Sequence, residues 1–323
     1  MERILPIKTD IMPRAYLGSA YLLGILQAVR KEDITPWILG NFLQVCIHEF
    51  NPNNIILNYY VPEMQYDTSD MIVNKIYLPS EVIFESGQII DFIKDAIDSE
   101  EYVIAYLNEY YIPNKRPYNI YHFDHPVLIF GYNTDKETVN IAGYQKSGTY
   151  GVDEISFENI KNATQNKDGI LFLYYLKDTG KTYEFSLGKI KKLLHNFINS
   201  SDTSDIGKHK FWGIEAYKEF LRMMANNGEI YGFIDIRGIY LFSEHAKILK
   251  ELWLFLIKTC DIKCENNLEE KIDSIILLAE EATTLGLKYN ISSSKMAYER
   301  LMEKCHLFLE NEADFVLELL KLI

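Results

Sequence analysis

The pattern of apolar and polar positions changes once along this chain. Before residue 180, short apolar runs alternate with polar turns, and several runs have the length and composition of strands. After residue 185, apolar positions recur every three to four residues over long segments, which is the period of an α-helix. The sequence therefore predicts an α+β domain over residues 1–180 and an all-helical domain over residues 185–323.

Individual elements can be predicted in both parts. Residues 17–29 are apolar nearly all round and long enough for a buried helix. Residues 35–48 have the pattern of a second helix, with Thr35 as a candidate N-cap and Pro36 in the first turn. We further expect strands at 54–60, 102–107, 125–132, 138–142 and 169–175, and helices at 86–97, 156–163, 186–199, 208–226, 243–260, 267–285 and 293–321.

Composition and charge exclude several classes of function. The formal net charge of -13 argues against a nucleic-acid-binding protein, which needs a basic surface, and against docking to anionic lipid. No apolar run approaches the ~20 residues of a membrane span, and the four cysteines are too scattered for a disulfide framework. These features predict a soluble cytoplasmic protein. We expect no cofactor, since the glycines form no phosphate-binding fingerprint.

The first candidate for chemistry is a histidine that opens an apolar strand. Residues 120–133 read IYHFDHPVLIFGYN, and His125 stands at the start of the predicted strand. A histidine in this place, facing the N-terminus of a buried helix, is typical of papain-type enzymes, in which it takes the proton of a cysteine. Taken alone, such a histidine is more often a packed structural residue than a catalytic base.

A longer block of residues around His125 resembles a known family. Residues 108–113 (NEYYIP), Tyr118 and residues 125–132 (HPVLIFGY) resemble the N-terminal domain of butirosin biosynthesis protein H and its relatives. Residues 151–160 are similar to the same group. The resemblance implies a papain-like fold near the bacteriocin-processing peptidases, with a buried N-terminal helix on an antiparallel sheet. Many relatives carry a helical appendage, which residues 234–237 and 244–245 resemble.

The resemblance also assigns positions in a catalytic site. It places His125 at the base position and Leu17 at the position of the nucleophilic cysteine, where leucine cannot attack a carbonyl carbon. The family's third residue, an aspartate, falls at Ala142 or Gly143, and neither side chain can orient the imidazole. Asn140 is a candidate orienting residue, although it comes two or three residues early. Of the three expected catalytic groups, only the histidine is present.

Cys46 is the alternative nucleophile. We expect it late in the helix predicted at residues 35–48, where the helix C-terminus raises a thiol pKa, so the structural interpretation is favoured. Cys260 and Cys264 are spaced to share a helix face, but His245 and His306 are not spaced to complete a metal site. We therefore predict no metal site.

Two functions remain after these observations. The first is a degenerate papain-fold protein that binds an acyl or peptidyl group, or a carrier protein, without covalent catalysis. The alternative is an active acyl- or aminoacyl-transferase that moves an acyl group from a carrier-protein thioester to a small amine, or a cysteine peptidase. The resemblance thus implies an acyl or peptidyl carrier protein, or an amine substrate, as partner.

Overall fold

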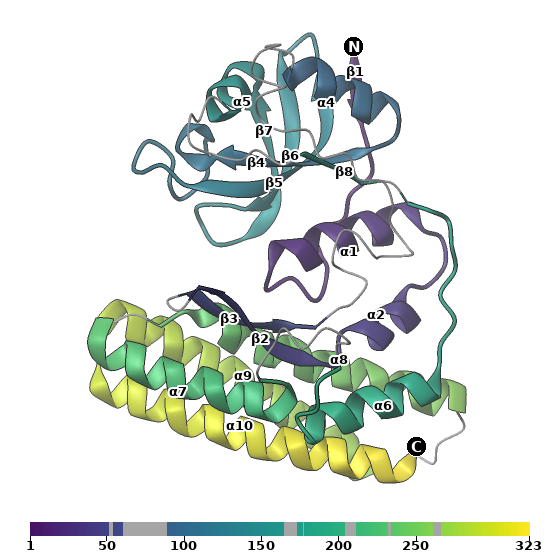
Figure 1. The fold of residues 1–323 in the computed structure, drawn as a ribbon, viewed down its shortest axis with the longest axis vertical. Helices are drawn as coiled ribbons and strands as arrows, with labels where there is room; N and C mark the ends of the chain where they lie inside the picture. Colours follow the sequence, from purple (N-terminus) through teal and green to yellow (C-terminus); the bar gives the residue numbers. More distant parts are fainter. Residues whose placement is uncertain are drawn as a thin grey trace. The chain divides into compact units, whose positions relative to one another are not determined.

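The structure, a computed structural model, divides the chain into two compact units. The first unit comprises Met1–Asp33 and Glu63–Thr182, and the second comprises Ile34–Pro62 and Tyr183–Ile323. An antiparallel sheet lies in the first unit and the long helices lie in the second, so the predicted α+β class with C-terminal helices is confirmed (Figure 1). The described residues are 1–51, 54–60, 89–164, 173–176, 178–203, 211–231, 234–260 and 266–323.

The sheet of the first unit is antiparallel. In the described part of the chain it has six strands, in the order β7-β6-β5-β4-β8, with β1 paired to β5. The predicted strands at 102–107, 125–132 and 138–142 are confirmed to within two residues. The strand bounds are β1 (Glu2–Ile4), β4 (Tyr102–Asn108), β5 (Asp124–Asn133), β6 (Thr138–Tyr144), β7 (Tyr150–Ser156) and β8 (Leu173–Leu176).

Strand β5 is the centre of this sheet. Its first half pairs with β4, where Leu107 lies opposite His125, and its last three residues pair with β1. The ladder between β5 and β6 is irregular between Ile129 and Gly131, as expected for a β-bulge. Because β4 ends beside the start of β5, the residues that follow β4 are brought next to His125.

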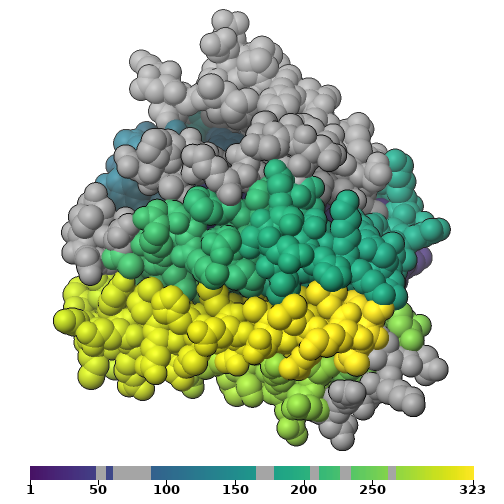
Figure 2. Space-filling view, turned by 60° about the horizontal axis from the view of Figure 1, so that its bottom comes forward, coloured from purple at the N-terminus to yellow at the C-terminus, as the bar shows by residue number. Residues whose placement is uncertain are grey.

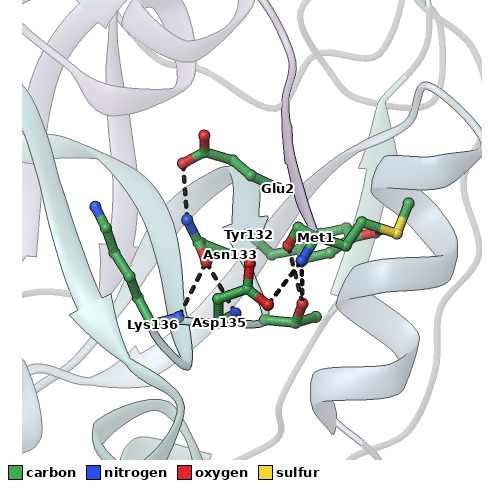
Figure 3. Close-up of polar contacts among 7 residues, drawn as sticks. Met1, Glu2, Tyr132, Asn133, Asp135 and Lys136 are labelled. Atoms are coloured by element: carbon green, nitrogen blue, oxygen red, sulfur yellow. Dashed lines mark hydrogen bonds and ion pairs between the residues drawn. The ribbon is translucent and has the colours of Figure 1, made fainter.

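The other end of β5 holds the N-terminal strand. The amino group of Met1 donates to the Thr134 hydroxyl at 2.7 Å and to the Asp135 carboxylate at 3.0 Å. Figure 3 shows Met1 beside Asp135 in this group of polar contacts. The Asn133 side chain closes the following turn, because its Oδ1 accepts from the backbone N–H groups of Asp135 and Lys136. These contacts fix the turn between β5 and β6.

Among the residues that the structure describes, three helices cover the sheet of the first unit. Helices α4 (Ile89–Asp98) and α5 (Phe157–Thr164) contact β4, and Figure 1 shows them at one face of the sheet, with α1 (Leu17–Val29) at the other. Residues 19–26 of α1 are all buried. The helix predicted at residues 17–29 is confirmed at both ends.

The second unit is a helical bundle with one small hairpin. In Figure 2, α6 and α7 lie along α10 on one face of this unit. The five helices predicted in this part are confirmed, although α8 begins earlier and α9 ends later than predicted. The bounds are α2 (Thr35–Asn41), β2 (Val45–Asn51), β3 (Asn54–Tyr59), α6 (Leu187–Ile198), α7 (Gly213–Tyr231), α8 (Ile236–Cys260), α9 (Asn266–Ser292) and α10 (Lys295–Leu322).

The helix predicted at residues 35–48 is wrong after residue 41. Helix α2 ends at Asn41, whose side-chain amide donates to the carbonyl of Trp37 at 2.8 Å, and the chain continues into β2. Strand β2 pairs with β3, and both strands contact α7. This pairing joins Ile34–Pro62 to the helical unit. The two units therefore differ from the predicted ranges 1–180 and 185–323 in this one segment.

Several predicted elements extend beyond the described residues. The predicted segments 86–97, 169–175 and 208–226 begin in residues that the structure does not describe. No helix in the described ranges is long and apolar enough to cross a membrane.

Candidate functional site

His125 is paired with a carboxylate that the sequence analysis did not single out. Its Nδ1 lies 3.2 Å from Oε1 of Glu109, which follows β4 in a single 3-10 turn (Glu109–Tyr111). Glu109 is buried, and the His125 side chain is 34% exposed. A carboxylate accepts from Nδ1–H and leaves Nε2 as the lone-pair nitrogen, which is the orientation that a general base needs. Nδ1 of the imidazole is therefore held by Glu109, and Nε2 has a lone pair that can accept a proton.

The first helix reaches the start of β5 through Tyr21. The Tyr21 hydroxyl donates to the carbonyl of Pro126, the residue after His125, at 2.8 Å. Leu17 is the first residue of α1, and positions four apart lie on the same face of a helix. Leu17 is thus one turn before Tyr21 on the face directed at this end of β5. Leu17 is half-buried.

Gly143 in β6 lies close to the hydroxyl of Tyr21. A Cβ atom built on Gly143 would be 3.3 Å from the Tyr21 hydroxyl and 2.8 Å from Nζ of Lys115. The position predicted for the missing acid therefore adjoins the helix that carries Leu17. The space that a side chain would occupy is taken by the ammonium group of Lys115.

Lys115 places a buried positive charge in this site. Its ammonium donates to the carbonyl of Tyr144 at 2.8 Å, and the residue is 2% exposed. Burial lowers the pKa of Lys115, and the nearby carboxylates of Glu109 and Asp153 oppose that shift. The charge of Lys115 thus interacts with the carboxylate that pairs with His125.

Three tyrosine rings lie next to one another in this site. The ring of Tyr150 lies 6.4 Å from that of Tyr21 and 5.7 Å from that of Tyr144, between centroids. The Tyr150 hydroxyl is buried and makes no hydrogen bond to any described residue. Burial is the main reason that the pKa of Tyr150 is raised above its ordinary value. The Tyr150 phenol therefore stays neutral at physiological pH.

Asn140 lies elsewhere in the sheet. It is opposite Gly131, six residues along β5 from His125, which corresponds to roughly 20 Å at the rise of a β-strand. The structure does not bring Asn140 to the imidazole, and the side chain that contacts Nδ1 of His125 is that of Glu109. The candidate assignment of Asn140 is therefore corrected.

Cys46 has a different environment from the one predicted. It lies in β2 of the second unit, in a strand where the sequence analysis expected a helix. Its sulfur is 3.2 Å from Nε2 of His48, and it is buried beside Tyr60 and Trp212. Burial, with a smaller effect of the charge of Asp202, raises the pKa of the Cys46 thiol far above its ordinary value. A thiol that resists ionisation is a poor nucleophile.

The sequence reasoning missed Glu109 and Lys115. Glu109 was part of the quoted block at residues 108–113, and its position directly after a strand was the available signal. Its pairing with His125 depends on the register of β4 against β5, which the local pattern does not contain. Within the described residues, no group of three or more His, Cys, Asp or Glu side chains could hold a metal ion.

Two comparisons of the sequence with known proteins gave no match. No protein-family model matches the sequence, and no curated protein matches it. The arrangement must therefore be interpreted from its own chemistry: an oriented imidazole, a buried ammonium and a set of phenols, next to the first turn of a buried helix.

Proposed function

We propose that the first unit is a papain-like domain in which the nucleophile position is occupied by Leu17. It binds an acyl or peptidyl group beside His125 without forming a covalent intermediate. The observation that carries the proposal is the position of Tyr21. This one side chain, a turn after Leu17, contacts both the backbone next to His125 and the space beside Gly143. The side chain of Tyr21 thus connects the helix that begins at Leu17 with the backbone beside His125 and with Gly143, which supports the proposal.

The start of α1 supports the binding part of the proposal. Its N-cap residue, Tyr16, makes no side-chain capping bond. The first N–H groups of a helix have no partner within the helix, and the helix dipole favours a negative or polar group there. A carbonyl or carboxylate oxygen of the ligand can accept from these groups while His125 faces the same group. Leu17 itself offers an apolar contact and no electron pair.

The test is whether a nucleophile at residue 17 restores covalent chemistry. We expect the wild-type protein to bind S-acetyl-N-acetylcysteamine, a small thioester, and to show no acyl adduct in its mass spectrum. Leu17→Cys should become acetylated at residue 17, and His125→Ala in that background should slow the acetylation at least about tenfold, because general-base assistance is lost. Val152→Cys provides an ordinary exposed thiol in the same unit as a control.

Two results would contradict the proposal. One is an acyl adduct on the wild-type protein that requires a native residue. The other is a Leu17→Cys thiol that reacts at the rate of the Val152→Cys thiol and does not depend on His125. In the second case the first turn of α1 does not belong to the site of His125.

The active alternative is supported by one observation, the Glu109–His125 pair. A general base can promote acyl transfer without an enzyme nucleophile. The amine nitrogen attacks the thioester carbonyl, the C–N bond forms, the C–S bond breaks, and His125 carries the proton from nitrogen to the departing thiolate. The wild-type protein would then form amide from thioester and amine, and His125→Ala would abolish this activity. An amide yield equal to that of buffer alone excludes this alternative and leaves the binding function.

A further inference from the structure

An exposed group of aromatic and aliphatic side chains stands beside His125. Four of the six residues from 118 to 123 present apolar side chains to solvent, and we call this group the aromatic lip. Its exposed fractions are 37% for Tyr118, 66% for Ile120, 49% for Tyr121 and 44% for Phe123. Exposed apolar side chains that gather in one place often mark a binding surface, whereas single ones need no explanation.

The lip is held in one conformation by backbone hydrogen bonds. The N–H of Asn119 donates to the carbonyl of Tyr110 at 3.0 Å, and the N–H of Glu109 donates to the carbonyl of Phe123 at 2.8 Å. The side chain of Asn108 accepts from the N–H of Phe123 at 3.3 Å. A surface that is already ordered loses little conformational entropy when a ligand binds.

The lip is continuous with the candidate site. The rings of Phe123 and His125 are 5.2 Å apart between centroids. Glu109 joins them from the other side, because its backbone bonds Phe123 and its carboxylate faces His125. A group bound at His125 therefore has the lip as its nearest apolar surface.

The charge of the lip limits what it can bind. Residues 117–123 (PYNIYHF) contain no Asp, Glu, Lys or Arg, although 24% of the whole chain is charged. The single imidazole in this segment, His122, stacks on Tyr110 at 4.4 Å and contacts the amide of Asn108 at 3.0 Å. A neutral apolar group complements this surface, and a phosphate or an acidic segment does not.

We infer that the aromatic lip binds the apolar part of the acyl group whose carbonyl lies at His125. This inference rests on the proposed function and adds the substrate class, a medium-length aliphatic or aromatic acyl group. Each buried methylene of such a group should strengthen binding about threefold to fourfold. The acyl group lies over Ile120, Tyr121 and Phe123, and its polar end points into the site.

The experiment uses a homologous series of N-acetylcysteamine thioesters, from acetyl to octanoyl, with the full-length protein. Dissociation constants are measured for the wild type, for Ile120→Ser/Tyr121→Ser and for Val152→Ala, an exposed apolar position on β7. We expect affinity to rise about threefold per methylene in the wild type and in Val152→Ala, and to be nearly independent of chain length in the lip variant. The lip variant changes side chains that are mostly in solvent, and circular dichroism checks that it is folded.

The experiment distinguishes an error in the inference about the aromatic lip from an error in the proposed function. If the acetyl thioester binds and His125→Ala abolishes binding, but longer chains bind no better, the lip inference is overturned and the proposed function stands. The inference is also overturned if chain length matters equally in the lip variant, or if the lip variant changes only self-association in sedimentation. If no thioester of the series binds, both the proposed function and the inference fail.

Discussion

At the residue scale, the chemistry of the first unit depends on which side chain faces His125. The resemblance gives His125 the base position and gives Ala142 or Gly143 the position of the third residue, on the strand after the hairpin. At Gly143, Lys115 fills the space that a side chain would need. The carboxylate comes from the opposite neighbour of β5, at the end of β4. A carboxylate at the end of β4, in place of one on β6, leaves no periodic signal in the sequence.

The first residue-scale prediction concerns the proton on His125. Glu109 accepts from Nδ1–H, so the neutral imidazole should carry its proton mainly on Nδ1. In Glu109→Gln this preference should weaken by about 1 kcal/mol, or roughly fivefold in the tautomer ratio, since the half-exposed site reduces the value of a charged hydrogen bond. Imidazole nitrogen chemical shifts measured by NMR report the ratio.

His122 is an internal control for this measurement. Its Nδ1 faces the side-chain amide of Asn108, which donates, so the proton of His122 should lie on Nε2 in both proteins. An unchanged His125 tautomer in Glu109→Gln would show that the carboxylate does not orient the base. Equal changes in both histidines would indicate a general disturbance of the loop.

The second residue-scale prediction concerns Cys46. Because burial raises its pKa, Cys46 should react with iodoacetamide at least about tenfold more slowly than the half-buried Cys260 in the folded protein at pH 8. Peptide mass mapping separates the two sites, and both should react fully in denaturant. If Cys46 reacts faster than Cys260 and His48→Ala removes the difference, the Cys46–His48 contact activates the thiol and our interpretation is wrong.

At the element scale, the sequence predicted the helix at residues 17–29 correctly, but it did not predict that the helix beginning at residue 35 ends at residue 41. Residues 17–29 form α1 as expected, because an unbroken apolar run of helix formers has few alternatives. Residues 35–48 divide into α2 and β2, because Val45, Cys46 and Ile47 find a ladder partner in β3 and a packing surface on α7. Strand formation by these residues is decided by tertiary contacts that a local window does not include.

One glycine tests the packing of α1. A Cβ atom at Gly24 would lie 2.8 Å from the backbone carbonyl oxygen of Lys8 and 3.2 Å from Cδ1 of Ile7. Gly24→Ala should therefore destabilise the first unit by about 1–3 kcal/mol, although alanine is the better helix former by ~1 kcal/mol. Hydrogen exchange of the β5 and β6 amides, followed by mass spectrometry, measures the loss.

A second glycine supplies the control for Gly24. At Gly188 in α6 the nearest atom to an added Cβ is 3.9 Å away, so Gly188→Ala should be neutral or stabilising by up to ~1 kcal/mol. If Gly24→Ala protects the β5 amides as well as the wild type does, the segment at Ile7 and Lys8 is not closely packed against α1.

At the scale of the whole molecule, the two units can be followed separately. The three tryptophans are Trp37, Trp212 and Trp253, and all of them belong to the second unit. Tryptophan fluorescence thus reports the unfolding of the helical unit, and the tyrosine-rich first unit needs another probe. The discontinuous second unit could not be predicted from the change in period near residue 180, because its N-terminal segment joins the helices only through long-range contacts.

A buried pair of hydrogen-bonded side chains links that N-terminal segment to the helices. Nδ1 of His245 in α8 is 3.0 Å from Oε1 of Glu312 in α10, and Nε2 of His245 is 3.3 Å from the carbonyl oxygen of Leu43. Both side chains are fully buried. The second oxygen of Glu312 and the hydroxyl of Tyr217 make no hydrogen bond to any residue in the described ranges. Among the described residues, only one of the two carboxylate oxygens of Glu312 therefore has a hydrogen-bond partner.

Glu312 makes the stability of the second unit depend on pH. Burial raises the pKa of Glu312 above its ordinary value, and the attraction of His245 opposes the shift without cancelling it. Above about pH 4.5, the folded state then binds more protons at this group than the unfolded state does, so the contribution of Glu312 to stability falls as pH rises through its folded pKa. Glu312→Gln removes the titration, and the stability of the wild type relative to this variant should decrease between pH 4.5 and pH 8. Urea unfolding followed by tryptophan fluorescence measures the difference. Glu219 gives a control of opposite sign at lower pH, because its hydrogen bond with Arg222 lowers its pKa below the ordinary value of about 4.5. The wild type should therefore gain stability relative to Glu219→Gln as pH rises from that lowered pKa to about 4.5, and the difference should be constant above pH 4.5. A difference for Glu312→Gln that is also constant between pH 4.5 and pH 8 would show that Glu312 is fully ionised in the folded protein across this range.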